Sequence, residues 1–271
     1  MRIAAVAAPF DRDLDADLER IAKTVTAARA EGATLVAFPE AALGGYLSDL
    51  DGDAPPPPAL KVDGPEIAEL VRLAGDTVVV AGFCEDGGGR WYNSAVAVGA
   101  GRVLGLHRKV HQPLSEDATY AAGSSFAAFD TPAGRMGMLI CYDKAFPEAA
   151  RSLALDGAEI ITCVSAWPSA RTNPAPDLAE DRWTRRFDLF DRARALENQV
   201  VWVSANQSGD FGSLRFVASA KVVDPGGEVL ATTGVAEGVA LADVDVPAAV
   251  HAARRYMGHL RDRRPHAYAS S

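Results

Sequence analysis

Apolar runs of strand length alternate with segments of helical spacing through both halves of this chain. Residues 3–8 and 34–38 have the apolar character of buried strands, and between them residues 15–30 place Leu18, Ile21 and Val25 on one helical face. Strands that are apolar on both faces need helices to cover them. This order of elements therefore predicts an α/β fold with a largely buried sheet.

The alternation continues to residue 243. The expected helices are residues 64–74, 146–156 and 183–197, and the expected strands are residues 77–83, 91–98, 103–107, 136–140, 159–164, 200–205, 215–224, 228–232 and 238–243. No linker-like change of composition separates the two halves, so we expect residues 1–271 to form a single domain. The polar segment 246–271 is expected to be a C-terminal tail that packs on a neighbouring subunit, with a partly mobile tail as the alternative.

The balance of charge excludes several classes of partner. Lys and Arg together number 27 against 36 Asp and Glu, which gives a formal net charge of -9, and the basic residues form only short pairs. Such a chain is poorly suited to bind nucleic acid or an anionic membrane. A small-molecule substrate fits the composition better.

The three cysteines, at positions 84, 141 and 163, form no disulfide framework and no metal-binding Cys-x-x-Cys pair, which indicates a reducing compartment. The apolar run before Pro9 is too short for a signal peptide, and no later run is long enough to span a membrane. We therefore expect a cytoplasmic protein. Cys84 and Cys163 are flanked by strand residues and are expected to pack in the core.

Cys141 lies between the expected strand 136–140 and a helix that carries Pro147 near its start. A thiol at such a strand-to-helix turn can face a cleft, while backbone N–H groups without helical partners point at whatever binds there. This is the arrangement that a nucleophile and its oxyanion need. The alternative is that Cys141 is a small buried hydrophobe at the end of a core strand.

Two further polar residues follow buried strands. Glu40 comes just after the apolar run 35–38, and Lys109 comes just after the strand 103–107. Because the carboxyl ends of neighbouring strands meet at one edge of an α/β sheet, we expect both side chains near Cys141. Taken singly, Glu40 is equally explained as a loop or capping carboxylate, and Lys109 as a solvated charge.

Other chemistries have weaker support. His107 and His111 have the spacing of metal ligands, but they lie in an extended segment without nearby acidic or cysteine partners, which argues against a zinc site. The chain has no Gly-x-Ser-x-Gly elbow, no phosphate-binding glycine loop and no dinucleotide fingerprint.

A series of motifs resembles the nitrilase, or carbon-nitrogen hydrolase, superfamily. In chain order they are Phe38-Pro39-Glu40 with Gly45-Tyr46, Tyr92-Asn93-Ser94, His107-Arg108-Lys109-Val110-His111, Cys141-Tyr142-Asp143 with Phe146-Pro147-Glu148, Ser165-Ala166-Trp167, residues 194–199, residues 205–209 and residues 223–227. The resemblance covers nearly the whole chain. It departs from the usual pattern at Gln112, Val164 and residues 218–220, which bear on the pocket and its loops.

The resemblance implies a four-layer α-β-β-α sandwich that assembles as a homodimer or a larger homo-oligomer. It also implies a catalytic set of Glu40, Lys109 and Cys141, with Glu116 as a second glutamate. Lys109 would favour the thiolate of Cys141, Glu40 would move the proton, and Lys109 with the Tyr142 backbone N–H would hold the oxyanion. Water would then hydrolyse the thioester, and no metal or organic cofactor is required.

The implied reaction is hydrolysis of a non-peptide C–N bond in a small linear amide or N-carbamoyl (ureido) compound, with release of ammonia or an amine. Nitrile hydrolysis on the same site is one alternative. A non-catalytic interaction protein that keeps the fold is another, although intact Glu40, Lys109, Glu116 and Cys141 argue against it.

Three features bear on the substrate. Lys144 either pairs with a substrate carboxylate or is a solvated lysine at the start of a helix. Trp167 either lines the pocket or caps the core. The loop 47–63, with Asp49, Asp51 and Asp53, either favours a cationic substrate or is only a solvated loop.

Overall fold

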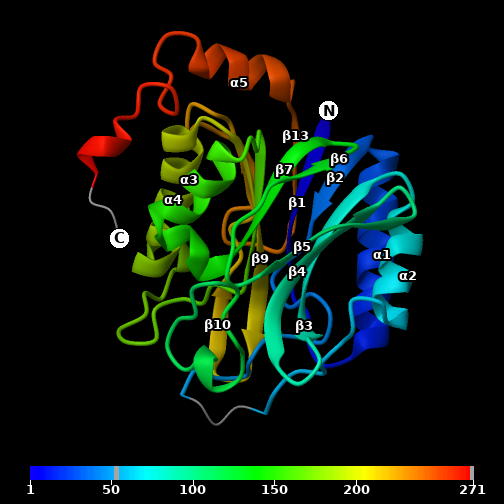
Figure 1. Ribbon diagram of the computed structural model, residues 1–271. Helices are drawn as coiled ribbons and strands as arrows, with labels where there is room; N and C mark the ends of the chain where they lie inside the picture. The colour runs from blue at the N-terminus through cyan, green and yellow to red at the C-terminus, as the bar shows by residue number, and fades with distance from the viewer. Residues whose placement is uncertain (52–54, 269–271) are drawn as a thin grey trace.

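The computed structural model describes residues 1–51 and 55–268, so the expectation for Asp53 falls outside the described residues. The helices flank the strands on two sides (Figure 1). On one side lie α1 (Leu14–Ala30) and α2 (Pro65–Ala74), and on the other lie α3 (Pro147–Leu155) and α4 (Arg182–Asn198). The Asp13 side chain caps α1 by accepting the Ala16 N–H at 3.1 Å, which satisfies a backbone donor without a helical partner.

The strands between these helices form two halves. The strands are β1 (Arg2–Ala8), β2 (Ala33–Ala37), β3 (Val78–Asp86), β4 (Trp91–Gly99), β5 (Arg102–Arg108), β6 (Phe129–Thr131), β7 (Gly134–Ile140), β8 (Ile160–Ser165), β9 (Val201–Phe211), β10 (Leu214–Val217), β11 (Lys221–Val223), β12 (Val229–Thr232) and β13 (Gly238–Asp243). The order β5-β4-β3-β2-β1 forms the first half and β9-β8-β7-β6 the second. The halves meet where β1 pairs with β9 in parallel at only two positions, Ala7 with Asn206 and Ala8 with Gln207.

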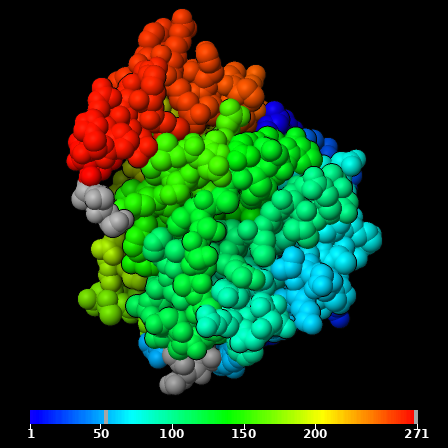
Figure 2. Space-filling view, viewed as in Figure 1, coloured from blue at the N-terminus to red at the C-terminus, as the bar shows by residue number. Residues whose placement is uncertain are grey.

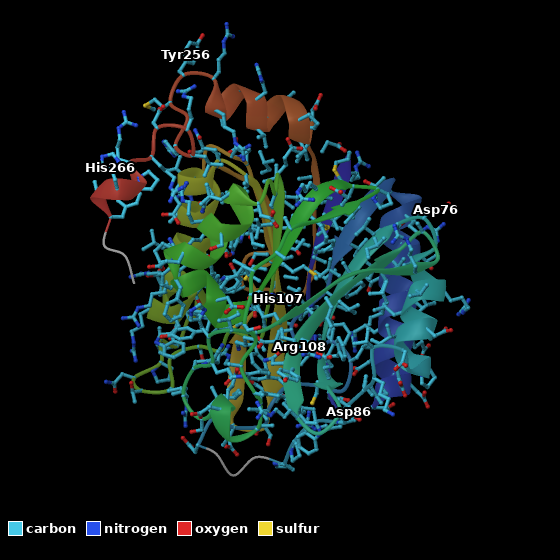
Figure 3. All side chains as sticks on the ribbon, viewed as in Figure 1. Asp76, Asp86, His107, Arg108, Tyr256 and His266 are labelled. Atoms are coloured by element: carbon cyan, nitrogen blue, oxygen red, sulfur yellow. The ribbon has the colours of Figure 1, made fainter. Side chains whose placement is uncertain are left out.

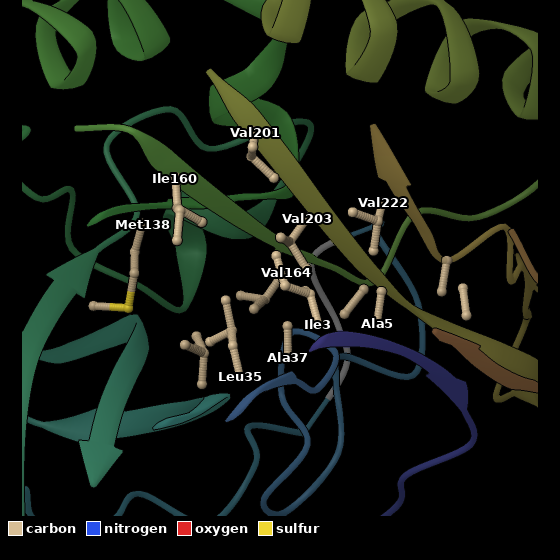
Figure 4. Packing of buried hydrophobic residues seen from close by; sticks show 14 of the residues in the cluster. Ile3, Ala5, Leu35, Ala37, Met138, Ile160, Val164, Val201, Val203 and Val222 are labelled. Carbon is tan, nitrogen blue, oxygen red and sulfur yellow. The ribbon is translucent and has the colours of Figure 1, made fainter. Parts of the chain in front are cut away.

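Alternate residues of each strand belong to different cores. Ile3 of β1 and Leu35 of β2 pack against Met138 and Val203 of the second half, so the two halves stack face to face (Figure 4). Val6 of β1 faces the opposite way and packs with α1 and α2. A third core, which includes residues of β7, β8 and β9, lies beneath α3 and α4. The expected four-layer α-β-β-α sandwich is therefore confirmed.

Two expected elements differ from the structure. The single strand expected at 215–224 is split into β10 and β11, because Ala218 and Ser219 have left-handed φ values of 55° and 58° that interrupt an extended chain. A short 3₁₀ helix, Cys141–Ala145, also precedes α3, so the helix proper starts at Pro147.

The C-terminal segment begins with a helix, α5 (Val246–Arg254), which the sequence analysis did not anticipate. Val246 and Val250 are one helical turn apart and both are buried in the core between the two halves. Beyond the helix, the Gln199 side chain donates to the Met257 carbonyl at 2.7 Å and accepts the His259 N–H at 2.9 Å. This segment covers one end of the molecule, as the orange and red surface in Figure 2 shows. A partly mobile tail stays a prediction. Packing on a neighbouring subunit stays a prediction.

Candidate active site

The carboxyl ends of several strands converge at one end of the sandwich. Asp76 precedes β3 and Asp86 ends it, so the labels in Figure 3 show that β3 runs toward the lower edge of that view. β2 runs parallel to β3. The residues after β2, β5 and β7 are Glu40, Lys109 and Cys141, which the structure brings together as expected.

Cys141 has a φ of 48°, in the left-handed region that residues with a side chain rarely occupy. The chain reverses there from β7 into the 3₁₀ helix, and this sharp turn exposes the thiol to a cavity while leaving Cys141 almost fully buried. Strained backbone of this kind persists only where the surrounding structure imposes it. The geometry therefore fits a positioned thiol better than an ordinary core cysteine.

Lys109 lies between two carboxylates. Its Nζ donates to Glu40 Oε1 at 2.8 Å and to Glu116 Oε1 at 2.7 Å, and all three side chains are 0% exposed. The Tyr46 hydroxyl donates to the same oxygen of Glu116. Glu116, whose direction the sequence left open, thus joins the cluster from the 3₁₀ helix Glu116–Ala118.

Glu40 is held by residues for which sequence reasoning assigned no role. Asn93 Nδ2 donates to Glu40 Oε1 at 2.6 Å, and the Ala166 N–H donates to Oε2 at 2.6 Å. Gly82 makes room for the turn, since a Cβ there would lie 2.4 Å from the Ala41 nitrogen. Asn93 and Ala166 stood in the motifs quoted above, so the signal was present. Their contact with Glu40 depends on strand pairing that no local pattern shows.

Burial sets the ionisation of the cluster. Burial alone lowers the pKa of Lys109, but the carboxylates of Glu116 and Glu40 outweigh it and hold that pKa well above its ordinary value. Burial raises the pKa of Glu116 to about 7, against the opposing effect of the Lys109 ammonium. At neutral pH, Glu116 is therefore poised between its acid and its carboxylate.

The Cys141 thiol is not acidified. Burial, followed by the charge of Glu40, raises the pKa of Cys141 well above its ordinary value. Lys109 acts in the expected direction and lowers it, but the effect is too small to offset the others. The effect expected of Lys109 is therefore present, but it does not prevail, and Cys141 is a neutral thiol in the unliganded site.

A cavity of about 410 Å³ opens onto Cys141. Its walls are largely aromatic, with the rings of Tyr46, Tyr142, Trp167, Trp183 and Phe190. Trp167 thus lines the pocket, which is one of the two alternatives that the sequence left open, and the Tyr142 ring lines it as well. The Trp167 indole donates to the Trp183 carbonyl at 3.1 Å, which fixes the ring against α4. The volume suits a small ligand with an apolar body.

Lys144 is neither solvated nor directed at the cavity. Its side chain is 0% exposed and donates to Asp191 Oδ1 of α4 at 2.8 Å, while Nζ lies 3.0 Å from the centroid of the Phe187 ring. Lys221 binds the other oxygen of Asp191 at 3.0 Å. The charge of Lys144 is already paired inside the protein. Lys144 is therefore a structural residue, and the expectation that it pairs with a substrate carboxylate is wrong.

His107 and His111 do have an acidic partner, contrary to expectation. His107 Nε2 lies 3.0 Å from Asp143 Oδ2 and His111 Nδ1 lies 2.9 Å from Asp143 Oδ1. Asp143 also accepts the His111 backbone N–H at 2.9 Å, so it ties the Lys109 loop to the Cys141 turn. Arg108, labelled beside His107 in Figure 3, instead pairs with Glu85. Over residues 1–51 and 55–268, no three His, Cys, Asp or Glu side chains are placed so that they could hold a metal ion together.

Asp49 and Asp51, the acidic-loop residues that the structure describes, do not present carboxylates to the cavity. Asp51 pairs with Arg171 at 2.5 Å, and Asp49 accepts the Asp51 N–H at 3.0 Å. The loop contributes apolar Leu50 to the cavity wall instead. As expected, Cys84 and Cys163 are buried. In the part of the chain that the structure describes, no helix has the length and apolar character needed to cross a membrane.

Comparison with known proteins agrees with the family resemblance seen in the sequence motifs. The carbon-nitrogen hydrolase family model matches residues 2–254. An omega-amidase of Xenopus laevis is 30% identical over 264 residues, which cover 92% of this chain and 87% of the relative. A nitrilase of Pyrococcus abyssi is 32% identical over 237 residues, which cover 86% of this chain and 84% of the relative.

Solved structures share the fold. The carbon-nitrogen hydrolase from Helicobacter pylori G27 has a TM-score of 0.84 at 24% identity, with 99% of this chain and 96% of that chain covered. A glutamate-to-glutamine mutant of the amidase from Nesterenkonia sp. AN1, with acrylamide added to its active-site cysteine, has a TM-score of 0.78 at 24% identity, with 98% and 97% covered.

Proposed function

Because the chain belongs to the carbon-nitrogen hydrolase family, we propose that it hydrolyses a small linear amide or N-carbamoyl compound through a thioester on Cys141. The observation that carries this proposal is the buried Glu40–Lys109–Glu116 cluster beside a cysteine that opens onto an apolar cavity. Buried charges are costly to maintain, and clusters of them beside a cavity are typical of catalytic sites.

In the proposed mechanism, Glu40 acts as the general base for a neutral thiol. A carboxylate has about four acceptor sites, and Lys109, Asn93 and the Ala166 N–H occupy three on Glu40, which leaves one on Oε2 for the Cys141 proton. As Sγ bonds to the substrate carbonyl carbon, the thiol proton moves to Glu40, so a separated thiolate does not accumulate.

The negative charge then develops on the carbonyl oxygen. Lys109 Nζ and the Tyr142 backbone N–H are proposed to hold it, since both lie beside the Cys141 turn. The C–N bond breaks as Glu40 returns the proton to the departing nitrogen, which leaves as ammonia or an amine. Glu40 next takes a proton from water, the hydroxyl attacks the thioester, and the proton returns to Sγ as the acid product leaves.

Glu116 is proposed to orient Lys109 and to help place the substrate. Its Oε2 is buried and has no hydrogen-bond partner among the described residues, so a bound substrate would find it free. Nitrile hydrolysis is the second candidate function, since both an omega-amidase and a nitrilase are relatives at about this identity. Homo-oligomerisation and a cytoplasmic location stay predictions.

The test is a screen of ammonia release over linear amides, N-carbamoyl acids and nitriles, with the Cys141→Ala variant as the control. We expect turnover of an amide or carbamoyl compound by the natural protein and none by the variant, at unchanged circular dichroism. Substantial hydrolysis by Cys141→Ala would refute the thioester. Turnover of nitriles alone would favour the second candidate.

Thiol labelling separates an enzyme from a non-catalytic relative. Iodoacetamide should modify one thiol per chain, at Cys141, because Cys84 and Cys163 are buried away from the cavity. A chain that neither labels at Cys141 nor releases ammonia from any compound would be an interaction protein that keeps the fold.

A further inference from the structure

Arg186 is the one charged side chain among the described residues that line the cavity. It lies on α4 between Trp183 and Phe190, at spacings of three and four residues, so all three side chains fall on the helix face that borders the cavity. The rest of the wall is apolar or aromatic. A single guanidinium in such a wall is a specific feature that a ligand would meet.

The other arginines of α4 all have partners. Arg182 donates to Thr172, Arg185 pairs with Glu180, Arg192 donates to the Gly227 carbonyl and Arg194 pairs with Glu197. Within residues 1–51 and 55–268, the Arg186 guanidinium has no carboxylate within 4.0 Å and no hydrogen-bond partner. Arg186 is also exposed to solvent, so its donors are accessible to a ligand.

Nearby acids are occupied elsewhere. Asp188 accepts from the Ser219 hydroxyl at 2.7 Å and pairs with Lys221 at 3.0 Å. Asp191 is bound by two lysines. No carboxylate of this helix is thus available to neutralise Arg186, and an anionic ligand would supply the missing partner.

We propose that Arg186 binds a carboxylate at the end of the substrate remote from the scissile C–N bond. This inference rests on the proposed function, because it takes Cys141 as the reacting end of the cavity. The substrate class is then a compound with an amide or carbamoyl group at one end, a carboxylate at the other and an apolar body between them. A planar guanidinium suits this role because it can bind a carboxylate with two parallel hydrogen bonds.

The test uses three amides of equal length that differ only at the remote end. Adipic acid monoamide carries a carboxylate there, hexanamide a methyl group and 6-aminohexanamide an ammonium. The natural protein should have the highest kcat/KM for the monoamide. Preference for hexanamide or 6-aminohexanamide would overturn the proposal, although turnover itself would leave the proposed function intact.

Two variants locate the effect. Arg186→Met keeps most of the apolar stem, and should lower kcat/KM for the monoamide by roughly 10- to 100-fold, mainly through KM, as expected for loss of a charge-assisted hydrogen bond. Hexanamide should change by less than about threefold, because it makes no such bond. Arg185→Met is the matched control, since that neighbour pairs with Glu180 and does not line the cavity. Equal losses for both amides, or the same loss in Arg185→Met, would overturn the assignment.

Binding to the Cys141→Ala protein gives a readout that needs no turnover. Calorimetry should show tighter binding of the monoamide than of hexanamide, and Arg186→Met in that background should remove the difference. Selective binding of the monoamide, without turnover of any amide or N-carbamoyl compound by the natural protein, would overturn the proposed function and support the carboxylate site. Equal binding of the two amides would overturn the carboxylate site.

Discussion

Lys109→Met should destabilise the protein as well as inactivate it. Lys109 is the shared counter-ion of Glu40 and Glu116, and all three side chains are fully buried. Removing one partner of a buried ion pair costs about 3–5 kcal/mol, because a charge is left without compensation. Glu116 can take up a proton, since its pKa is already raised to about 7. The loss of folding free energy therefore comes mainly from the buried charge of Glu40.

The cost should depend on pH. Loss of the Lys109 ammonium removes the effect that opposes burial, and so raises the folded-state pKa of Glu116 further above its value in the unfolded chain. Such groups contribute full stability at low pH and lose it as pH rises through the folded pKa. We therefore expect the stability deficit of Lys109→Met to be small near pH 5 and to reach about 3–5 kcal/mol near pH 8. Urea denaturation at both pH values measures it.

The double variant Lys109→Met with Glu116→Gln is the control, because it removes one of the two uncompensated charges. It should recover part of the deficit at pH 8 and little at pH 5. A deficit below about 1 kcal/mol that does not change with pH would refute the shared counter-ion. In a folded sample, kcat should fall by roughly 100-fold or more while KM changes little, as for loss of an oxyanion donor.

Two further substitutions test the surroundings of the cluster. Glu116→Gln should lower kcat/KM by roughly 100-fold or more and remove an inflection near pH 7 from the wild-type profile, because burial raises the pKa of this carboxyl to about 7. The wild type should also lose stability relative to this variant as pH rises from about 4.5 to about 7, and near-normal kinetics would make Glu116 a structural residue. Gly82→Ala should cost about 1–3 kcal/mol and reduce kcat/KM, because the new Cβ meets the Glu40–Ala41 backbone at 2.4–2.6 Å. Unchanged denaturation and kinetics in that variant would show that the Glu40 turn can move freely.

Local patterns were sufficient to predict the order of most helices and strands and three residues of the site, whereas the four layers followed from the family resemblance. Glu40, Lys109 and Cys141 each follow an apolar run, and strand ends meet at one edge whatever the details of the sequence. The C-terminal helix had a readable signal as well. Asp245 caps it by accepting the Ala248 N–H, and the burial of Val246 and Val250 follows helical spacing, but the polar composition of the segment concealed it.

Local sequence patterns could not predict contacts between residues that lie far apart in the chain. From the sequence, Lys144 could be a substrate ligand because it lies three residues after Cys141. Its actual partner, Asp191, lies far along the chain on α4. The acidic partner of His107 and His111 was in a quoted motif, yet only the packing of β5 beside β7 brings Asp143 to both rings. The ionisation of Cys141 likewise depends on burial, which no spacing reveals.

The position of β1 has a consequence for biosynthesis. β1 leaves the ribosome before the other strands of this sheet, but β13, which pairs with it from Arg2 to Ala7, begins only at Gly238. At ordinary rates of translation the second strand follows the first by about 10 to 50 seconds. During that time the edge of β1 from Arg2 to Ala7 lacks its β13 partner, and unpaired apolar edges invite wrong pairing. The edge of β1 that β13 covers in the folded protein is therefore open to wrong pairing until residue 243 has been synthesised.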